Sequence, residues 1–171
     1  MRRVKVAGLS LIDDIRAASR LMVRELGFMD ATVAASDYPP SAVHTILEIG
    51  IRGPMSSGEL GDFLRLEKSS VSRLVRKLID CGELRETPDE ADARSKLLSL
   101  TAKGRRTLEA LHAFGRQQVS GALAALTVTE QRTVREGMML YARALRQSRM
   151  EDEALSAAQA VVPAKAGTHT A

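Results

Sequence analysis

The spacing of apolar residues along the chain predicts a mainly helical protein. In several long segments, apolar side chains recur every three or four positions with polar residues between them, which is typical of helices that bury one face. The expected long helices span about residues 9–27, 41–52, 102–126 and 129–149. The expected N-cap residues of the last three helices are Ser41, Thr101 and Thr129.

The segment between these long helices has a different pattern. Ser56 and Glu59 have the spacing of a capping box before a short helix, and a second short helix with one apolar stripe begins near Lys68. The stretches ELRE (83–86) and KLLSL (96–100) flank a polar segment, which predicts two antiparallel strands around a polar tip. We therefore expect a winged helix-turn-helix with a small two-stranded β wing, between long N- and C-terminal helices.

The polar face of the second short helix is basic. Between positions 68 and 79 it carries four cations and three serines but no acidic residue. Ordinary exposed helix faces alternate charges to gain i,i+4 pairs, so an acid-free face favours an anionic partner over the alternative of a solvated face without one. One helix fits the major groove of DNA, and small hydroxyl side chains let it approach closely. The predicted contacts are Lys68, Ser69, Ser70, Ser72, Arg73, Arg76 and Lys77.

The tip of the predicted hairpin supplies a second basic group. Beside a helix in the major groove, Arg94 would meet the negative potential of the adjacent minor groove. Asp92 is placed to orient this guanidinium, and Ser95 and Lys96 are placed to contact phosphates. The alternative is that Arg94 only neutralises the acidic residues around it and that the loop has no partner.

Composition and charge narrow the function class. The chain has a formal net charge of +4 and a pI near 9.6, which agrees with an anionic partner without requiring one. A single cysteine excludes an internal disulfide framework, and neither a secretion signal nor a membrane-spanning stretch is recognised, so we expect a cytoplasmic protein. No catalytic set, metal-ligand spacing or phosphate-binding loop occurs, so neither enzymatic activity nor a cofactor is expected.

The sequence GPMSSGELGDFLRLEKSSVSRLVRKLIDCGELRE, followed by DEADARSKLLSLTAKG, resembles the MarR family of bacterial winged-helix transcription regulators. The similarity covers residues 53–104, and its specific part is the pattern of Asp92, Arg94, Leu98, Leu100, Thr101 and Gly104. The resemblance implies that the basic helix faces the major groove and that Arg94 enters the minor groove. Two residues depart from the family pattern, because Glu83 replaces an apolar residue at the start of the wing and Cys81 replaces a charged one.

The resemblance also implies a homodimer in which the helices at 9–27 and 105–149 form the interface. An independent argument is that these helices carry more apolar surface than a small winged-helix core covers. The expected organisation is one MarR-like domain at 1–150, with the winged helix-turn-helix at 41–104, and a flexible tail at 151–171. The chain is also similar to the DNA-binding half of MarR–acetyltransferase fusions, but we expect no acetyltransferase domain.

Members of the family often bind a small molecule, frequently an aromatic acid, between the dimer helices and the winged helix. By this resemblance, the candidate effector-pocket residues are Arg16, Phe28, Tyr38 and His44. The alternatives are a core or boundary role for His44 and a surface role for Arg16. Cys81 lies near cations, as an oxidant-sensing thiol would, but its place at a helix C-terminus disfavours a thiolate and favours a structural thiol.

The function expected from these observations is that of a sequence-specific regulator that binds double-stranded DNA. The resemblance implies a homodimeric repressor on a pseudo-palindromic operator, released by a small-molecule effector. Twofold symmetry places the half-sites roughly 10 bp apart. Two alternatives remain open: a winged-helix module that binds an acidic protein partner, and a redox regulator that acts through Cys81.

Overall fold

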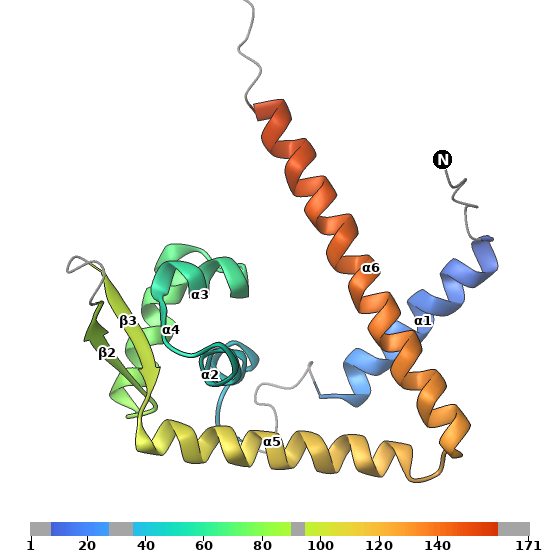
Figure 1. Ribbon diagram of the computed structural model, residues 1–171, viewed down its shortest axis with the longest axis horizontal. Coiled ribbons are helices and arrows are strands. Elements are labelled where there is room, and N and C mark those ends of the chain that lie inside the picture. The colour runs from blue at the N-terminus through green and yellow to red at the C-terminus, as the bar shows by residue number, and fades with distance from the viewer. Residues whose placement is uncertain (1–7, 28–35, 90–94, 161–171) are drawn as a thin grey trace, which may run out of the picture. The chain divides into compact units, whose positions relative to one another are not determined.

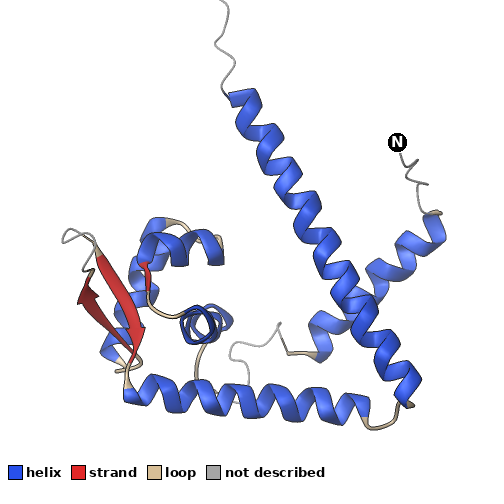
Figure 2. Ribbon diagram, viewed as in Figure 1, coloured by secondary structure: helices blue, strands red, loops and turns tan. Residues whose placement is uncertain are grey.

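The computed structural model describes residues 8–27, 36–89 and 95–160 (Figure 1). The chain divides into two compact units, Met1–Val119 and Ser120–Ala171. The described part consists of helices and one small sheet, which confirms the predicted mainly α, winged-helix class (Figure 2). Within these ranges, no helix combines the length and the apolar character that a bilayer-spanning segment requires.

The winged helix-turn-helix lies in the first unit. Its helices are α2 (Pro40–Arg52), α3 (Ser57–Leu64) and α4 (Lys68–Asp80), and its strands are β1 (Met55–Ser56), β2 (Leu84–Pro88) and β3 (Lys96–Leu100). α3 packs against α4, and α2 packs against both helices and against β3, so these elements enclose one core (Figure 1). The hairpin of β2 and β3 is the predicted wing, and β2 lies against α4.

Two predicted helix starts are confirmed by their capping bonds. In the capping box of α3, Glu59 N donates to Ser56 Oγ at 3.2 Å and Ser56 N donates to Glu59 Oε2 at 2.8 Å. Gly104 N donates to Thr101 Oγ1 at 3.0 Å, so Thr101 caps α5 (Ala102–Leu123). These bonds satisfy N–H groups that have no partner within the helix.

The predicted N-cap of α2 is wrong. The helix begins at Pro40, so Pro39 is the N-cap and Ser41 lies inside the first turn. Proline suits this position because its φ angle is already helical and the first N–H groups of a helix have no partner within it. The carbonyl oxygen of Ser41 instead accepts a hydrogen bond of 2.8 Å from Thr45 Oγ1.

The predicted N-cap of α6 (Val128–Ala160) is also wrong, because Thr127 rather than Thr129 caps this helix. Glu130 N donates to Thr127 Oγ1 at 3.3 Å, and Thr127 N donates to Glu130 Oε2 at 2.8 Å. This second capping box requires an acidic side chain three positions after the cap. Thr127 has one at that position, whereas Thr129 is followed there by a cation.

The sheet contains one strand more than predicted. Its order is β1–β3–β2, and both pairings are antiparallel. Leu84 pairs with Leu100 in the wing, whereas β1 adds Met55 opposite Leu98. A strand of two residues is too short for an alternating pattern, so its pairing with β3 defines it and the sequence spacing does not.

The core of the winged helix is aliphatic. Its buried residues are Ala42, Val43, Ile46, Ile49, Met55, Leu60, Val71, Val75, Leu78, Leu84, Leu98, Leu100 and Leu111. They come from all the elements of the winged helix and from α5. Gly104 of α5 packs so closely on the carbonyl oxygen of Glu83 that a Cβ atom would overlap it. This contact joins α5 to the root of the wing.

The long helices outside the winged helix bury little within one chain. α1 (Leu9–Glu25) buries none of its residues, and no described side chain of α6 is buried. α6 also extends to Ala160, beyond the end expected near residue 149. The added segment is rich in Ala and also carries Glu, Leu and Gln, which favour helix even where no core covers them.

Candidate nucleic-acid interface

α4 exposes its predicted basic face. Val71, Val75 and Leu78 are buried in the core, so the polar residues between them occupy the opposite side of the helix. Among the predicted contacts Ser70 is half-buried. The exposed ones are Lys68, Ser69, Ser72, Arg73, Arg76 and Lys77.

The four cations of α4 keep their charge available. Among the described residues, no ion pair is formed by these cations, which are Lys68, Arg73, Arg76 and Lys77. Arg73 Nη2 donates to Ser70 Oγ at 3.3 Å, a long contact between neighbours on one turn. An external anion can therefore approach this face without first breaking an ion pair.

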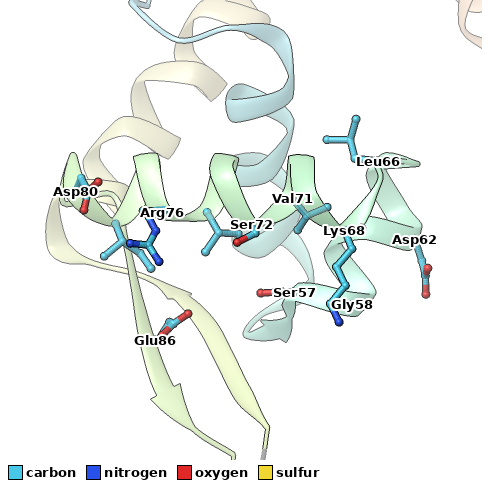
Figure 3. Close-up of a pocket in the computed structure, with 13 residues that line it drawn as sticks. Ser57, Gly58, Asp62, Leu66, Lys68, Val71, Ser72, Arg76, Asp80 and Glu86 are labelled. Atoms are coloured by element: carbon cyan, nitrogen blue, oxygen red, sulfur yellow. The ribbon is translucent and has the colours of Figure 1, made fainter.

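One side of α4 forms the wall of a groove of about 720 Å³ (Figure 3). Lys68, Ser72 and Arg76 are spaced four residues apart and project from α4 into this groove. Its other walls include Ser57 at the start of α3 and Glu86 of β2. The groove thus lies where both helices of the helix-turn-helix meet the wing.

The groove is mixed in charge. Asp62, Asp80 and Glu86 line it together with Lys68 and Arg76. These three acids belong to α3, to the end of α4 and to β2, so only the fold brings them together and no local sequence pattern predicts their position. Carboxylates repel phosphate, so the groove attracts a phosphodiester less strongly than a purely basic groove would.

A second stripe of α4 has no acidic neighbour in the groove lining. Ser69, Arg73 and Lys77 are also spaced four residues apart, and none of them lines the groove. A helix turns by about 100° per residue, so this stripe lies beside the first and farther from the wing. α4 therefore offers one row of side chains toward the wing and another away from it.

The described part of the wing includes two of its four predicted contacts. Ser95 is half-buried, and Lys96 is exposed, with its Nζ 2.7 Å from Glu86 Oε2. An exposed ion pair of this kind contributes little to stability, so Lys96 can exchange Glu86 for another anion at small cost. Asp92 and Arg94 lie outside the described residues.

Residues 36–95 match the sequence model of the MarR family. The uncharacterized HTH-type transcriptional regulator YdgG of Bacillus subtilis (strain 168) is 35% identical over 63 residues, which are 36% of this chain and 41% of that protein. The chain therefore matches less than half of the length of this curated relative.

Solved structures share the MarR-type fold over most of their length. Streptococcus pneumoniae FabT in complex with DNA has a TM-score of 0.69 and 18% identity, over 80% of this chain and 98% of that one. Bordetella bronchiseptica BpsR, whose DNA binding is regulated by 6-hydroxynicotinic acid, has a TM-score of 0.59 and 18% identity, over 76% of this chain and 98% of that one. At this level of identity, the similarity establishes the fold.

Among the described effector candidates, none lines the groove beside α4. Arg16 is exposed on α1, where its Nη1 lies 3.6 Å from Asp13 Oδ1. His44 is exposed on α2, so it is not part of the core of the single chain, and its boundary role stays open. Phe28 lies outside the described residues, and Tyr38 belongs to the segment that precedes α2.

The Tyr38 hydroxyl has an internal partner. It donates to Glu83 Oε1 at 2.7 Å. Burial, and next the hydrogen bond to this carboxylate, raises the pKa of Tyr38 above its usual range. The hydroxyl therefore stays protonated and serves as a donor within the fold.

Cys81, the other departure from the family pattern, is half-buried and forms the C-cap of α4. Its carbonyl oxygen accepts a hydrogen bond of 2.7 Å from Lys103 Nζ. This contact joins the end of the basic helix to α5 through the backbone and does not involve the thiol.

Proposed function

We propose that this protein is a sequence-specific transcription regulator that binds double-stranded DNA as a homodimeric repressor. The observation that carries the proposal is the exposed face of α4, whose four cations form no ion pair with the described residues. Such a helix fits the major groove, where Arg and Lys side chains bond to guanine and to phosphates. FabT, which shares the fold, forms a complex with DNA, and this supports DNA as the partner.

The two stripes of α4 divide the proposed contacts. Arg73, on the stripe away from the wing, is placed to reach base edges and phosphates, and among the described residues it forms no ion pair. Arg76, on the groove side, lies closer to the strands of the wing, and Arg94 stays the predicted minor-groove contact from the sequence. With α4 in the major groove and the wing over the minor groove, the DNA backbone between the two grooves would pass along this side.

The homodimer is proposed from the exposed apolar faces of α1 and α6. Leu9 on α1 is 81% exposed and Leu145 on α6 is 53% exposed, and other large apolar residues are exposed on both helices. Apolar surface of this extent usually marks an interface. A second copy of the chain would cover it and would present two copies of α4 to successive half-sites of a pseudo-palindromic operator.

We also propose that a small-molecule effector releases the DNA by changing the angle between the two copies of α4. BpsR, whose DNA binding is regulated by 6-hydroxynicotinic acid, supports this by its similar fold. The effector residues of this chain stay a prediction: Arg16, Phe28, Tyr38 and His44. A redox regulator acting through Cys81 is the weaker alternative, because the described contacts of this residue involve its backbone.

A rival from another class is a winged helix whose basic face binds an acidic protein. The test is to incubate the purified chain with a random duplex library, to select the bound sequences, and to footprint the enriched site. We expect a pseudo-palindrome with half-sites roughly 10 bp apart and an affinity that falls steeply with salt. Failure to retain any duplex at low salt would support the rival.

Substitutions on α4 test the assignment of the recognition helix. Arg73→Ala or Arg76→Ala should relax base preference at one position and weaken binding by roughly 1–3 kcal/mol. Arg116→Ala removes the same charge from α5 and should leave base preference unchanged. If affinity and preference are the same in both α4 variants as in the unmodified chain, α4 is not the element that reads DNA.

A further inference from the structure

A buried carboxylate lies at the point where α4, the wing and α5 meet. Glu83 follows the C-terminus of α4, and it is 0% exposed. Its side chain is fully buried, at a position where an apolar side chain would avoid the cost of removing a charge from water. A charged residue at such a site therefore needs an explanation.

The partners of Glu83 come from distant parts of the chain. Tyr38, which precedes α2, donates its hydroxyl to Glu83 Oε1 at 2.7 Å. Lys103 of α5 places its Nζ 3.2 Å from the same oxygen. Among the described residues, the other oxygen, Oε2, is buried without a hydrogen-bond partner. The carboxylate is thus held from one side by a hydroxyl and an ammonium group.

The backbone of Glu83 makes the same connections. Glu83 N donates to the carbonyl oxygen of Leu78 in α4 at 2.8 Å, and Thr101 N donates to the Glu83 carbonyl oxygen at 3.0 Å. Lys103 Nζ also donates to the carbonyl oxygen of Cys81, the C-cap of α4, at 2.7 Å. Glu83 therefore joins the end of α4 to the start of α5: its backbone bonds to Leu78 and Thr101, and its side chain contacts Lys103.

We propose that Glu83 is a positioning residue that sets the angle of α4 relative to α5, with Tyr38 and Lys103 as its two anchors. The proposal rests on the proposed function, because the angle matters only if α4 reads DNA. α5 directly precedes α6, a proposed dimer helix, in the sequence, so in the proposed dimer this angle would decide where each copy of α4 meets its half-site. Glu83 touches no DNA and acts through α4 alone.

The test compares stability with binding in the full-length chain. The key variant is the double substitution Tyr38→Phe with Glu83→Leu, which removes the buried hydroxyl and the buried carboxylate together. Replacing a buried polar pair by apolar side chains often leaves stability unchanged or raises it. We therefore expect an unfolding midpoint no lower than that of the unmodified chain, which excludes loss of folding as the cause of any change in binding.

The binding probes are duplexes that the unmodified chain enriches from a random library. Each is made with its two half-sites, with one half-site, and with one or two base pairs inserted between the half-sites. We expect the double variant to bind the two-half-site duplex about tenfold more weakly and to lose its preference for the original spacing, while its affinity for a single half-site stays within about twofold. Lys103→Met should produce a smaller change of the same kind.

Glu109→Gln, which removes a carboxylate from an exposed position on α5, is the matched control and should change neither probe. The proposal is overturned if the double variant keeps the affinity and the spacing preference of the unmodified chain. It is also overturned if one-site and two-site affinities fall by the same factor, because that result indicates a structural role only. If the unmodified chain enriches no duplex, the proposed function itself fails, which is a separate outcome.

Discussion

The winged helix and the long helices α1 and α6 differ in where their apolar residues lie. In the winged helix Leu60 is 0% exposed, and the aliphatic side chains of several elements enclose it. On α1 and α6, large apolar residues such as Leu9 and Leu155 remain 81% and 61% exposed. Both regions have apolar residues at helical spacing, but only the winged helix covers them within one chain.

This difference separates two tasks within the molecule. The element proposed to contact DNA is held by a core that a single chain completes, so its local shape does not depend on a partner. The helices proposed to position that element lack such a core. A helix in a protein gains most of its stability from packing against other elements, and an isolated helix is only marginally stable. We infer that the single chain determines the shape of α4 and that the spacing between two copies of α4 depends on the second chain.

The largest expected effect comes from the core of the winged helix. Leu60→Ala should lower the free energy of unfolding by about 2–5 kcal/mol, because it leaves a cavity among residues that cannot fully collapse. Leu9→Ala, at an exposed position, should change the free energy of unfolding of the dilute chain by no more than about 0.5 kcal/mol. Denaturant titrations at low protein concentration measure both. Similar losses in the two variants would contradict the difference in burial between the winged helix and α1.

A charge on the apolar face of α6 should separate the copies without unfolding the chain. Val134, Met138, Tyr141 and Leu145 lie on one face of α6, since they are spaced by four, three and four residues. Leu145→Glu places an unpaired carboxylate in the proposed interface and should weaken self-association about 100-fold, or roughly 3 kcal/mol. Sedimentation velocity over a range of concentrations measures this change.

Thr129→Glu is the control for this experiment, because it adds the same charge in the first turn of α6 and away from that face. It should leave self-association unchanged. If Leu145→Glu also leaves the mass in solution unchanged, the apolar face of α6 is not the interface between copies.

The smallest expected effect concerns the two capping boxes, one in each region. Hydrogen bonds from the backbone and side chain of Ser56 lower the pKa of Glu59, and bonds from the side chain and backbone of Thr127 lower the pKa of Glu130. Because each folded-state pKa lies below the ordinary value of 4.5, this stabilisation is present above that pH and is lost as the pH falls through the lowered pKa. Mild acid should therefore loosen the starts of both α3 and α6.

Circular dichroism from about pH 6 to about pH 3 measures this loss of helix. Glu130→Gln should remove the part that belongs to α6, and Glu59→Gln should remove the part that belongs to α3. An acid transition of equal size in the double variant and in the unmodified chain would exclude both boxes as its source. Because both carboxylates are exposed, we expect a shallow change of slope and no separate unfolding step.

Signals that act within a few residues were predicted well. The apolar stripe of α4 and the box of Ser56 and Glu59 depend on neighbours three or four positions apart, and the structure has both. The predicted cap of α6, Thr129, lacks an acidic residue three positions later, whereas Thr127 has one in Glu130. That signal was present in the sequence.

Features that depend on distant residues were not predicted. β1 exists because Met55 meets Leu98 across the sheet, and no local pattern marks it. The acids of the groove, such as Asp62 and Glu86, join Arg76 only after α3, α4 and β2 have packed together. Likewise, Glu83 stood out in the sequence as a departure from the family pattern, but its burial and its bond to Tyr38 did not.

The sequence by itself determined which segments become helices, which face of α4 is basic and where the wing begins. These properties follow from the order of apolar and polar residues along the chain, because the periodicity of a helix or strand decides which residues lie on the same face. Only the tertiary structure decided which charges share the groove, which carboxylate is buried, and which apolar faces stay uncovered. Those outcomes depend on the packing of segments far apart in sequence, and packing is set by shape and volume rather than by spacing.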